Sequence, residues 1–304
     1  MKSDVNGWNA GRLGLVGLGR MGLAILPRLL AAGPEITVWN RSSEKTHIAA
    51  EMGARVASSL QDLCDKSDVI LTIVFDDAAL KDVFLGPAGL LSSACGGKLF
   101  IDMSTVLPET ARAIGQAAKV ALASFVSAPV CGSVGPAKEG KLLVLAGGSP
   151  EDYERAKPVL SLFSRKVEHV GAVGSGSAMK LAVQLPISVY WQSLAEALSL
   201  GRESGLDLGQ MLRLIADSPA ALPALPSKIK TILLEDNDVS FDIQSAQKDA
   251  SLMQREAQRL GVNLPTASSA LKAFSAAMES GWSDRDIATI VNYVFCSGGH
   301  DSQR

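Results

Sequence analysis

The stretch LGLVGLGRMGLAILPRLLAAG, residues 13–33, decides the fold, because it joins a short apolar run to a helical segment through the glycine pattern GxGxxG. The three glycines are Gly17, Gly19 and Gly22. Glycines at this spacing allow a tight turn and let a pyrophosphate approach the backbone over the amino-terminal end of a helix. The pattern alone is weak evidence. A strand before it, a helix after it and a second strand ending near residue 40 are together typical of a dinucleotide-binding fold.

The end of the second predicted strand, ITVWN, indicates which nicotinamide cofactor binds. An acidic residue at this place would bind the ribose 2′-hydroxyl of NAD. The sequence instead continues Asn40, Arg41, Ser42, and a guanidinium with neighbouring hydroxyls suits the additional 2′-phosphate of NADP. We therefore expect NADPH to be preferred over NADH. The alternative is that Arg41 is simply solvent-exposed at a strand end.

Short apolar segments alternate with amphipathic ones as far as residue 170, which predicts parallel strands joined by crossover helices. After the first two strands, the further candidates are residues 69–75, 98–104, 124–130 and 141–148. The rest of the chain is mostly helical, with long segments at 178–204, 206–216, 244–260 and 265–280. The predicted fold class is α/β: a Rossmann-type dinucleotide-binding domain over residues 1–173, then a long interdomain helix and a smaller all-α domain over 174–304. Pro186 is expected to bend the long helix.

Composition excludes several classes of protein. A length of 304 residues suits two domains of roughly 100–200 residues each. The net charge of −2 gives no basic excess for binding nucleic acid. The apolar run VILTIVF is far short of the roughly 20 residues of a membrane span. Neither a signal peptide nor CxxC spacing is present, so we expect a cytoplasmic protein with neither a metal site nor a disulfide framework.

Four blocks of sequence carry a resemblance to a known family. They are GLVGLGRMG (14–22), DMSTVLP (102–108), APVCGSVGPAKEGKLLVLAGG (128–148) and GSGSAMKLAVQ (174–184). With Lys248-Asp249 as a short fifth match, the chain resembles the β-hydroxyacid dehydrogenases. This family includes hydroxyisobutyrate dehydrogenases and the tartronate semialdehyde, glyoxylate and succinic semialdehyde reductases. The blocks occur in the family's order over nearly the whole chain.

The resemblance implies a set of site residues. The pyrophosphate turn would be Gly17, Leu18, Gly19, Arg20, Met21 and Gly22, followed at the 2′-phosphate by Asn40, Arg41 and Ser42. Phe75, Asp76 and Thr105 would lie around the ribose and the nicotinamide. The substrate carboxylate would be held by Ser104 and by the backbone of Cys131, Gly132 and Ser133. Lys248 would close over both ligands. Lys180 would be the catalytic lysine and Gln184 its supporting amide.

Two departures from the family pattern leave the substrate open. Cys131 stands where the family usually has a hydroxyl side chain, and a thiol is a weaker hydrogen-bond donor. Val183 stands where the family usually has the first of two amides, of which only Gln184 is kept.

The chemistry of hydride transfer also favours a role for Lys180. Reduction of a carbonyl leaves negative charge on its oxygen, and a lysine ammonium can stabilise that charge and donate a proton. Lys180 and Gln184 are four residues apart and share one helix face. The alternative is a structural lysine whose ammonium reaches solvent along its own stem. Asp102 is expected to organise the turn after its strand rather than to take part in the chemistry.

The predicted function is an NADP(H)-dependent oxidoreductase acting on a small carboxylate-bearing β-hydroxyacid, semialdehyde or 2-oxo acid. Two alternatives stay open. One is a related imine reductase, which Lys180 argues against because those enzymes typically carry aspartate or tyrosine there. The other is a catalytically silent dinucleotide-binding scaffold. A homodimer or homotetramer is expected, because related proteins pair through the all-α domain.

Overall fold

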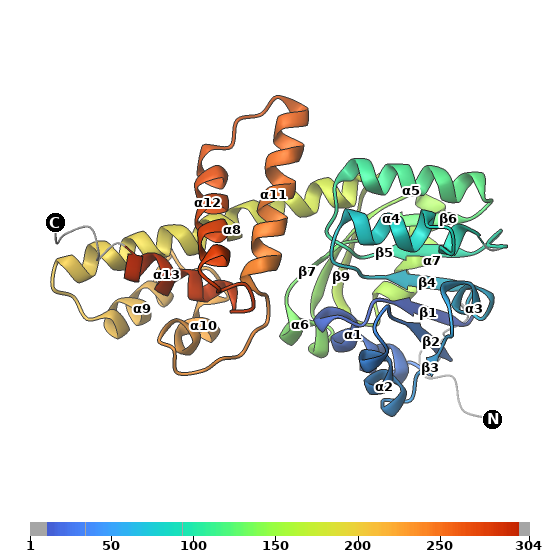
Figure 1. Ribbon diagram of the computed structural model, residues 1–304, viewed down its shortest axis with the longest axis horizontal. Helices are drawn as coiled ribbons and strands as arrows, with labels where there is room; N and C mark the ends of the chain where they lie inside the picture. The colour runs from blue at the N-terminus through green and yellow to red at the C-terminus, as the bar shows by residue number, and fades with distance from the viewer. Residues whose placement is uncertain (1–10, 34, 93, 298–304) are drawn as a thin grey trace. The chain divides into compact units, whose positions relative to one another are not determined.

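The computed structural model describes residues 11–33, 35–92 and 94–297. The chain divides into two compact units, Met1–Lys180 and Leu181–Arg304 (Figure 1). The division falls inside one long helix, α8 (Ser175–Glu203), which continues through Pro186, whereas the sequence placed the domain boundary at about residue 173. An α/β first unit and an all-helical second unit confirm the predicted fold class.

The first unit is built on one sheet, in which nine strands are described in the order β3-β2-β1-β4-β5-β6-β8-β7, with β9 paired to β8. Strands β3 to β6 of this order pair in parallel. The strands are β1 (Leu13–Val16), β2 (Ile36–Trp39), β3 (Arg55–Val56), β4 (Val69–Thr72), β5 (Leu99–Asp102), β6 (Ser124–Ser127), β7 (Val130–Cys131), β8 (Leu142–Gly147) and β9 (Ser164–Gly171).

The expectation of parallel pairing throughout is wrong for the last strands. Strand β8 runs antiparallel to both β6 and β7, and only its pairing with β9 is parallel. Residues 132–141 are all that joins β7 to β8, and a parallel crossover needs a dozen residues or more. The predicted strand 124–130 is also divided, because Pro129 has no backbone N–H to donate to a ladder.

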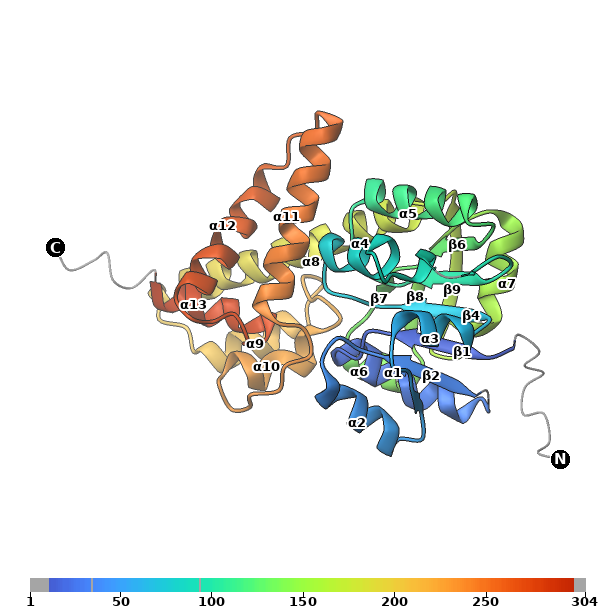
Figure 2. The same cartoon turned by 45° about the vertical axis from the view of Figure 1, so that its right-hand side comes forward.

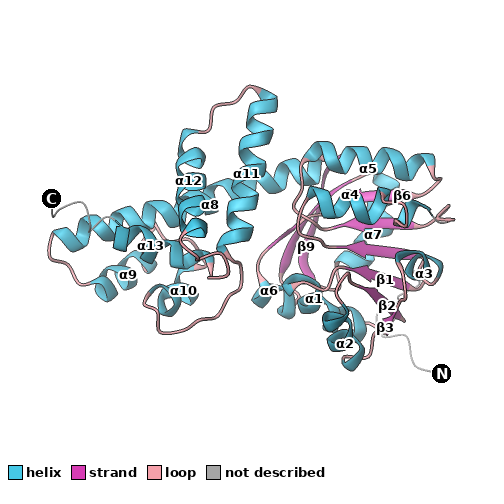
Figure 3. Ribbon diagram, in the orientation of Figure 1, coloured by secondary structure: helices cyan, strands magenta, loops and turns pink. Residues whose placement is uncertain are grey.

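Helices cover both faces of the sheet (Figures 2 and 3). Alternate strand residues point to opposite faces, so Leu13 and Leu15 join one apolar core, while Val16 joins the other. The first core includes residues of α1 (Arg20–Ala31), α2 (Ser43–Glu51), α6 (Val134–Glu139) and α7 (Pro150–Leu160). The second includes residues of α3 (Leu60–Asp65), α4 (Asp77–Leu85), the short helix η1 (Leu90–Ser92) and α5 (Pro108–Val120).

The carboxyl ends of the central parallel strands meet at one edge of the sheet. Val16 is in register with Thr72, Thr72 with Asp102, and Asp102 with Ser127. The loops after these residues therefore emerge side by side, which is where open α/β sheets bind ligands.

The second unit packs its helices around a separate apolar core that includes Trp191, Leu198 and Phe274. After α8 its helices are α9 (Leu208–Ala216), α10 (Leu225–Ile232), α11 (Ile243–Leu260), α12 (Pro265–Glu279), η2 (Ile287–Thr289) and α13 (Ile290–Ser297). Helices α11 and α12 lie side by side in Figure 1. Among the residues described, no helix has the length and apolar character needed to cross a bilayer.

A buried ion pair holds the segment that leads into α11. The Lys228 ammonium lies 2.6 Å from Oδ2 of Asp286, a residue only 1% exposed. The same carboxylate oxygen accepts hydrogen bonds from the backbone N–H and the hydroxyl of Ser240. Asp242 then begins α11 by accepting a bond from the N–H of Ser245. Because Lys248 lies on α11, this cluster fixes the helix that carries it.

Candidate active site

The glycine turn lies between β1 and α1. A Cβ atom on Gly17, whose φ is +97°, would lie 2.1 Å from the carbonyl oxygen of Ile73, and one on Gly22 would lie 2.0 Å from that of Gly17. Both positions therefore require glycine for packing. At Gly19 a Cβ atom would meet nothing within 4 Å, so open space adjoins the turn here. Gly19 is also the N-cap of α1 and provides no side-chain cap. Uncapped N–H groups facing open space suit the pyrophosphate of a dinucleotide.

The remaining residues of the turn contribute differently. Leu18 is fully buried and belongs to the apolar core of the first unit. Arg20 is exposed and Met21 is half-buried. The Asn40 side chain supports the turn from the end of β2, since its Oδ1 accepts a 2.9 Å hydrogen bond from the Leu18 N–H. Its Nδ2 donates to the backbone oxygen and the hydroxyl of Ser42.

Arg41 and Ser42 are exposed at the carboxyl end of β2, just before α2 begins. The Asn40 carboxamide occupies the place where an NAD enzyme would carry an acidic side chain. Arg41, exposed directly after Asn40, adds a positive charge at this edge.

The loops after β4 and β5 are joined by a buried hydrogen-bond network around Asp102. The carboxylate oxygen Oδ1 of Asp102 accepts 2.7 Å bonds from the hydroxyls of Thr72 and Ser104. Burial raises the pKa of Asp102 to about 6, although the bonds from Ser104 and Thr72 act in the opposite direction. This carboxylate is only 1% exposed, which supports the expectation that it organises the turn.

Ser104 is more deeply engaged than the sequence indicates. Its side chain is 1% exposed, and its hydroxyl accepts a 2.9 Å bond from the Val74 N–H while it donates to Asp102. The single proton of this hydroxyl is donated to Asp102 here, and the role of Ser104 at the substrate carboxylate stays a prediction. The neighbouring Thr105 is half-buried, and Phe75 is 45% exposed. Asp76 caps α4 by accepting a bond from the Ala79 N–H.

The predicted carboxylate-binding segment follows β7. Cys131 is half-buried, Gly132 has a φ of +128°, and Ser133 is the N-cap of α6 without a side-chain bond. Burial raises the pKa of the Cys131 thiol, and the positive charge of Lys180 opposes that shift. The structure therefore brings Lys180 close enough to Cys131 for its charge to act on the thiol.

Close packing at the start of α8 produces this proximity. A Cβ atom on Gly176 would lie 2.3 Å from the carbonyl oxygen of Leu145 and 2.5 Å from that of Ser127. The Ser127 hydroxyl also accepts a 3.0 Å bond from the Gly174 N–H. The first turn of α8 is thus held against the ends of β6 and β8. Lys180, one turn later, is only 7% exposed.

Two predicted residues belong to the second unit. Gln184 lies one turn after Lys180 along α8 and is 6% exposed. Lys248 lies on α11, and its ammonium forms a 2.8 Å ion pair with Oδ1 of the adjacent, buried Asp249. Within the first unit, the structure brings the glycine turn together with the ends of β2, β4 and β5, and it packs the start of the helix that carries Lys180 against the ends of β6 and β8.

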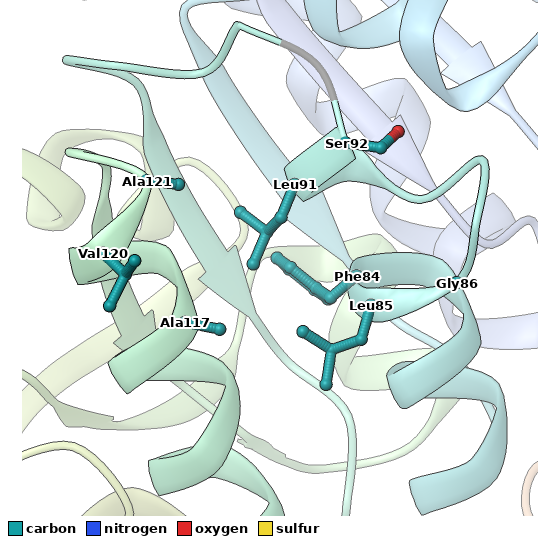
Figure 4. A pocket seen from close by; sticks show the side chains of 8 residues that line it. All are labelled: Phe84, Leu85, Gly86, Leu91, Ser92, Ala117, Val120 and Ala121. Carbon is teal, nitrogen blue, oxygen red and sulfur yellow. The ribbon is translucent and has the colours of Figure 1, made fainter.

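A hollow of about 520 Å³ in the first unit lies away from these residues (Figure 4). Its lining comes from the carboxyl-terminal ends of α4 and α5 and from η1, and it includes Phe84, Leu91 and Val120. Both helices begin at the carboxyl edge of the sheet and end at the opposite edge. The hollow is therefore not part of the dinucleotide edge. In the described part of the chain, no group of three or more His, Cys, Asp or Glu side chains is placed to hold a metal ion.

Three residues outside the predicted set also shape the carboxyl edge: Thr72, Val74 and Asp77. Thr72 bonds Asp102, Val74 bonds Ser104, and Oδ1 of Asp77 accepts a 3.0 Å bond from the Leu107 N–H. Thr72 is a polar residue at the end of an apolar strand, and this position could have marked it in the sequence as a residue of the carboxyl edge. The partner of each group depends on strand register, which the sequence does not display.

Comparison with known proteins gives the family. Residues 12–171 match the model described as the NAD binding domain of 6-phosphogluconate dehydrogenase. Residues 174–294 match the NAD-binding region of NADP-dependent 3-hydroxyisobutyrate dehydrogenase. The chain belongs to the β-hydroxyacid dehydrogenase family. The predicted recognition is confirmed, and the amino-terminal unit of this oxidoreductase is a domain for binding a nicotinamide dinucleotide.

Individual family members are similar over most of their length. Glyoxylate/succinic semialdehyde reductase 1 of Arabidopsis thaliana is 31% identical over 93% of this chain and 98% of its own. A probable mitochondrial 3-hydroxyisobutyrate dehydrogenase-like protein of the same plant is 34% identical over 87% of this chain and 79% of its own. Because such relatives include an organellar protein, the cytoplasmic location stays a prediction.

Solved structures agree on the fold. A 3-hydroxyisobutyrate dehydrogenase from Salmonella typhimurium has a TM-score of 0.84 at 25% identity, covering 93% of this chain and 99% of its own. A protein named Psf3, solved in complex with NADP+ and 2-OPP, has the same TM-score and the same coverage at 28% identity.

Proposed function

We propose that this β-hydroxyacid dehydrogenase family member is an NADPH-dependent reductase of a small carboxylate-bearing semialdehyde or 2-oxo acid, or its reverse, a β-hydroxyacid dehydrogenase. Lys180 is the proposed general acid and base. The observation that carries the proposal is the burial of Lys180, only 7% exposed, one turn after the start of α8 packs against the ends of β6 and β8. Glyoxylate, succinic semialdehyde and tartronate semialdehyde are the candidate substrates, and the name of the Arabidopsis relative supports the first two.

The chemistry requires three contributions from the chain. When bound, the nicotinamide supplies or accepts the hydride. The ammonium of Lys180 stabilises the charge that develops on the carbonyl oxygen and gives that oxygen a proton, and the amine form takes the proton back in the oxidative direction. The low exposure of Lys180 strengthens this interaction, because little water competes for the oxygen.

The substrate carboxylate is assigned to the backbone N–H groups of Gly132 and Ser133. These groups do not depend on side-chain identity, so the replacement of a hydroxyl by the Cys131 thiol leaves them in place. The place of Ser133 supports this assignment, since it is the N-cap of α6 and its side chain does not cap the helix, which leaves N–H groups at this helix end for a ligand. Gln184 and Lys248 are proposed to complete the site.

The preference for NADPH rests on the end of β2. An exposed guanidinium at Arg41 and the hydroxyl of Ser42 suit a 2′-phosphate, and the chain presents Asn40 in place of a carboxylate there. Titration of the wild type with NADPH and with NADH, followed by tryptophan fluorescence, checks this directly. Arg41→Ala should weaken NADPH binding about tenfold and leave NADH nearly unchanged. Equal affinity of the wild type for the two cofactors would contradict the preference.

The catalytic proposal is tested with a panel of small carboxylate-bearing carbonyl compounds and NADPH. On the best substrate, Lys180→Ala should lower kcat by about 100-fold to 10,000-fold, which is the usual range for loss of a general acid. Its Kd for NADPH should stay within a factor of about three. Lys166, an exposed lysine paired with Glu168, provides a matched control, and Lys166→Ala should retain wild-type kcat.

Two results would contradict the proposed function. Full turnover by Lys180→Ala would remove the lysine from the mechanism. A wild-type protein that binds NADPH but reduces no carboxylate carbonyl would instead favour the imine reductase or the silent scaffold. A panel of cyclic imines distinguishes these two alternatives, because an imine reductase would reduce them and a silent scaffold would not.

A further inference from the structure

The loops after β4 and β5 are braced against each other at two points. At the strand end, the Ser104 hydroxyl accepts from the Val74 N–H and donates to Asp102. Further out, the Asp77 carboxylate accepts from the Leu107 N–H. Phe75 and Thr105, both predicted to lie near the ribose and nicotinamide, sit between the two braces. We call residues 73–77 together with residues 103–107 the braced platform.

Asp102 is the buried anchor of this platform. Its carboxylate bonds Thr72 on the neighbouring strand and the hydroxyl of Ser104, and it also accepts a longer 3.3 Å bond from the Ser104 N–H. Thr72 is fully buried and Asp102 is 1% exposed. A charge-assisted bond in such surroundings is stronger than one at the surface, and removing the carboxylate would take away the acceptor of both hydroxyl protons.

The platform also contacts the glycine turn. The Ile73 N–H donates to the Val16 oxygen, and the Ile73 oxygen occupies the space that a side chain on Gly17 would need. A shift of residues 73 and 74 would therefore be transmitted to the turn predicted to bind the pyrophosphate. The connection runs from Asp102 through Ser104 and Val74 to Gly17, entirely within the first unit.

We propose that Asp102 is a positioning residue for the cofactor: through Ser104 and Thr72 it holds the braced platform in the geometry that binds the nicotinamide half of the dinucleotide. The inference rests on the proposed placement of the nicotinamide over Phe75 and Thr105. It does not depend on which substrate is reduced. Asp102 itself touches neither ligand in this account, and its effect passes through the side chains that it holds.

The test compares cofactor binding with stability. NADPH and NADH are each titrated into wild-type protein and into Asp102→Ala, Asp102→Asn and Thr72→Val, and Tm is measured for all four proteins. Asp102→Ala and Thr72→Val should weaken both cofactors by a similar factor of about ten, because the platform lies away from the 2′-phosphate. Asp102→Asn should bind within a factor of about three of wild type, since an amide oxygen can still accept from the two hydroxyls.

The matched control is Thr37→Val. Thr37 is a buried threonine on β2, 3% exposed, and it is not part of the Asp102 network. Whatever its effect on Tm, Thr37→Val should leave the Kd for NADPH and the Kd for NADH unchanged. Thr72→Val also keeps the inference testable if Asp102→Ala fails to fold.

The outcomes are separable. If Thr72→Val and Asp102→Ala lower Tm but leave both Kd values unchanged, Asp102 is structural only and the inference is wrong. If wild type binds NADPH, Asp102→Ala and Thr72→Val bind it more weakly, and Asp102→Asn and Thr37→Val do not, the inference holds even where no carboxylate substrate is turned over. A wild-type protein that bound neither cofactor would overturn the inference together with the cofactor assignment.

Discussion

Asp102 makes the stability of the first unit depend on pH. Burial raises its pKa from 3.8 to about 6, and the nearby carboxylate of Asp77 adds to the shift. A raised pKa means that the folded protein holds this proton more tightly than the unfolded chain does. The carboxyl group therefore favours folding when protonated, and that contribution is lost as the pH rises through 6.

We predict that the free energy of unfolding of wild type falls relative to Asp102→Asn by about 2 to 3 kcal/mol between pH 4 and pH 7, from a shift of about two pKa units. The asparagine keeps the shape of the side chain but does not titrate in this range. Urea unfolding of both proteins at several pH values measures the difference. Parallel stability curves would show that Asp102 ionises with an ordinary pKa.

Single residues divide sharply into those whose role is local and those whose role depends on register. The glycine turn was predictable, because its three glycines, the strand before it and the helix after it are adjacent in sequence. The engagement of Ser104 was predictable only in part. Its bond to Asp102, two residues earlier, is local and belongs to the turn that Asp102 was expected to organise. Its bond from the Val74 N–H forms because Thr72 and Asp102 are in register on neighbouring strands, and the sequence does not display that register.

At the scale of elements, two glycines of the turn between β1 and α1 are needed for different reasons. Gly22 is required by packing, since a Cβ atom there would lie 2.0 Å from a backbone oxygen. Gly19 has no such constraint, because nothing lies within 4 Å and its φ of −66° suits any residue. If a dinucleotide fills the space beside Gly19, a methyl group there should affect binding and not folding.

We predict that Gly19→Ala changes Tm by no more than about 2 °C but weakens NADPH and NADH at least about tenfold, because the added Cβ enters the space of the pyrophosphate. Gly22→Ala should instead lower Tm by several degrees, as strain at a closely packed glycine does. Thermal unfolding and cofactor titration of the two variants provide both readouts. Unaltered cofactor binding by Gly19→Ala would place the pyrophosphate elsewhere.

Elements with strong apolar periodicity were predictable and elements at the sheet edge were not. Strands β1, β4 and β5 are buried at every position and read as apolar runs. Strand β9 has the sequence SRKVEHVG and no fully buried residue, so it lacks that pattern. Charged side chains on such an edge strand protect it from pairing with other chains. The antiparallel pairing of β8 with β7 was also not predicted. It follows from the short connection between them, residues 132–141, which is too short for a parallel crossover.

At the scale of the molecule, the proposed chemistry draws on residues of both units. The glycine turn, the braced platform, Cys131 and Lys180 belong to the first unit, and Gln184 and Lys248 belong to the second. The change from alternating strands and helices to helices alone made two domains predictable. The two compact units divide inside α8, at Lys180, whereas the two family models meet between residues 171 and 174, so the boundary predicted at 173 stays a prediction.

The association of chains is the property that one sequence constrains least, and a homodimer or homotetramer through the all-α unit stays a prediction. Two exposed leucines support it. Leu200, 74% exposed, lies near the end of α8, and Leu206, 55% exposed, lies in the turn that follows, where its N–H bonds the Gly201 oxygen. Exposed apolar side chains that gather at one place mark association surfaces more often than isolated ones do.

We predict that wild type is an oligomer and that the double variant Leu200→Glu, Leu206→Glu is not, because a symmetric interface would bring the introduced charges of two chains together. Size-exclusion chromatography with light scattering measures the mass. The matched control is Val120→Glu with Leu85→Glu in the first unit, at residues 75% and 49% exposed, which adds the same charge to a different apolar surface. Dissociation by the control pair alone would move the interface to the hollow between α4 and α5, and a monomeric wild type would contradict the association altogether.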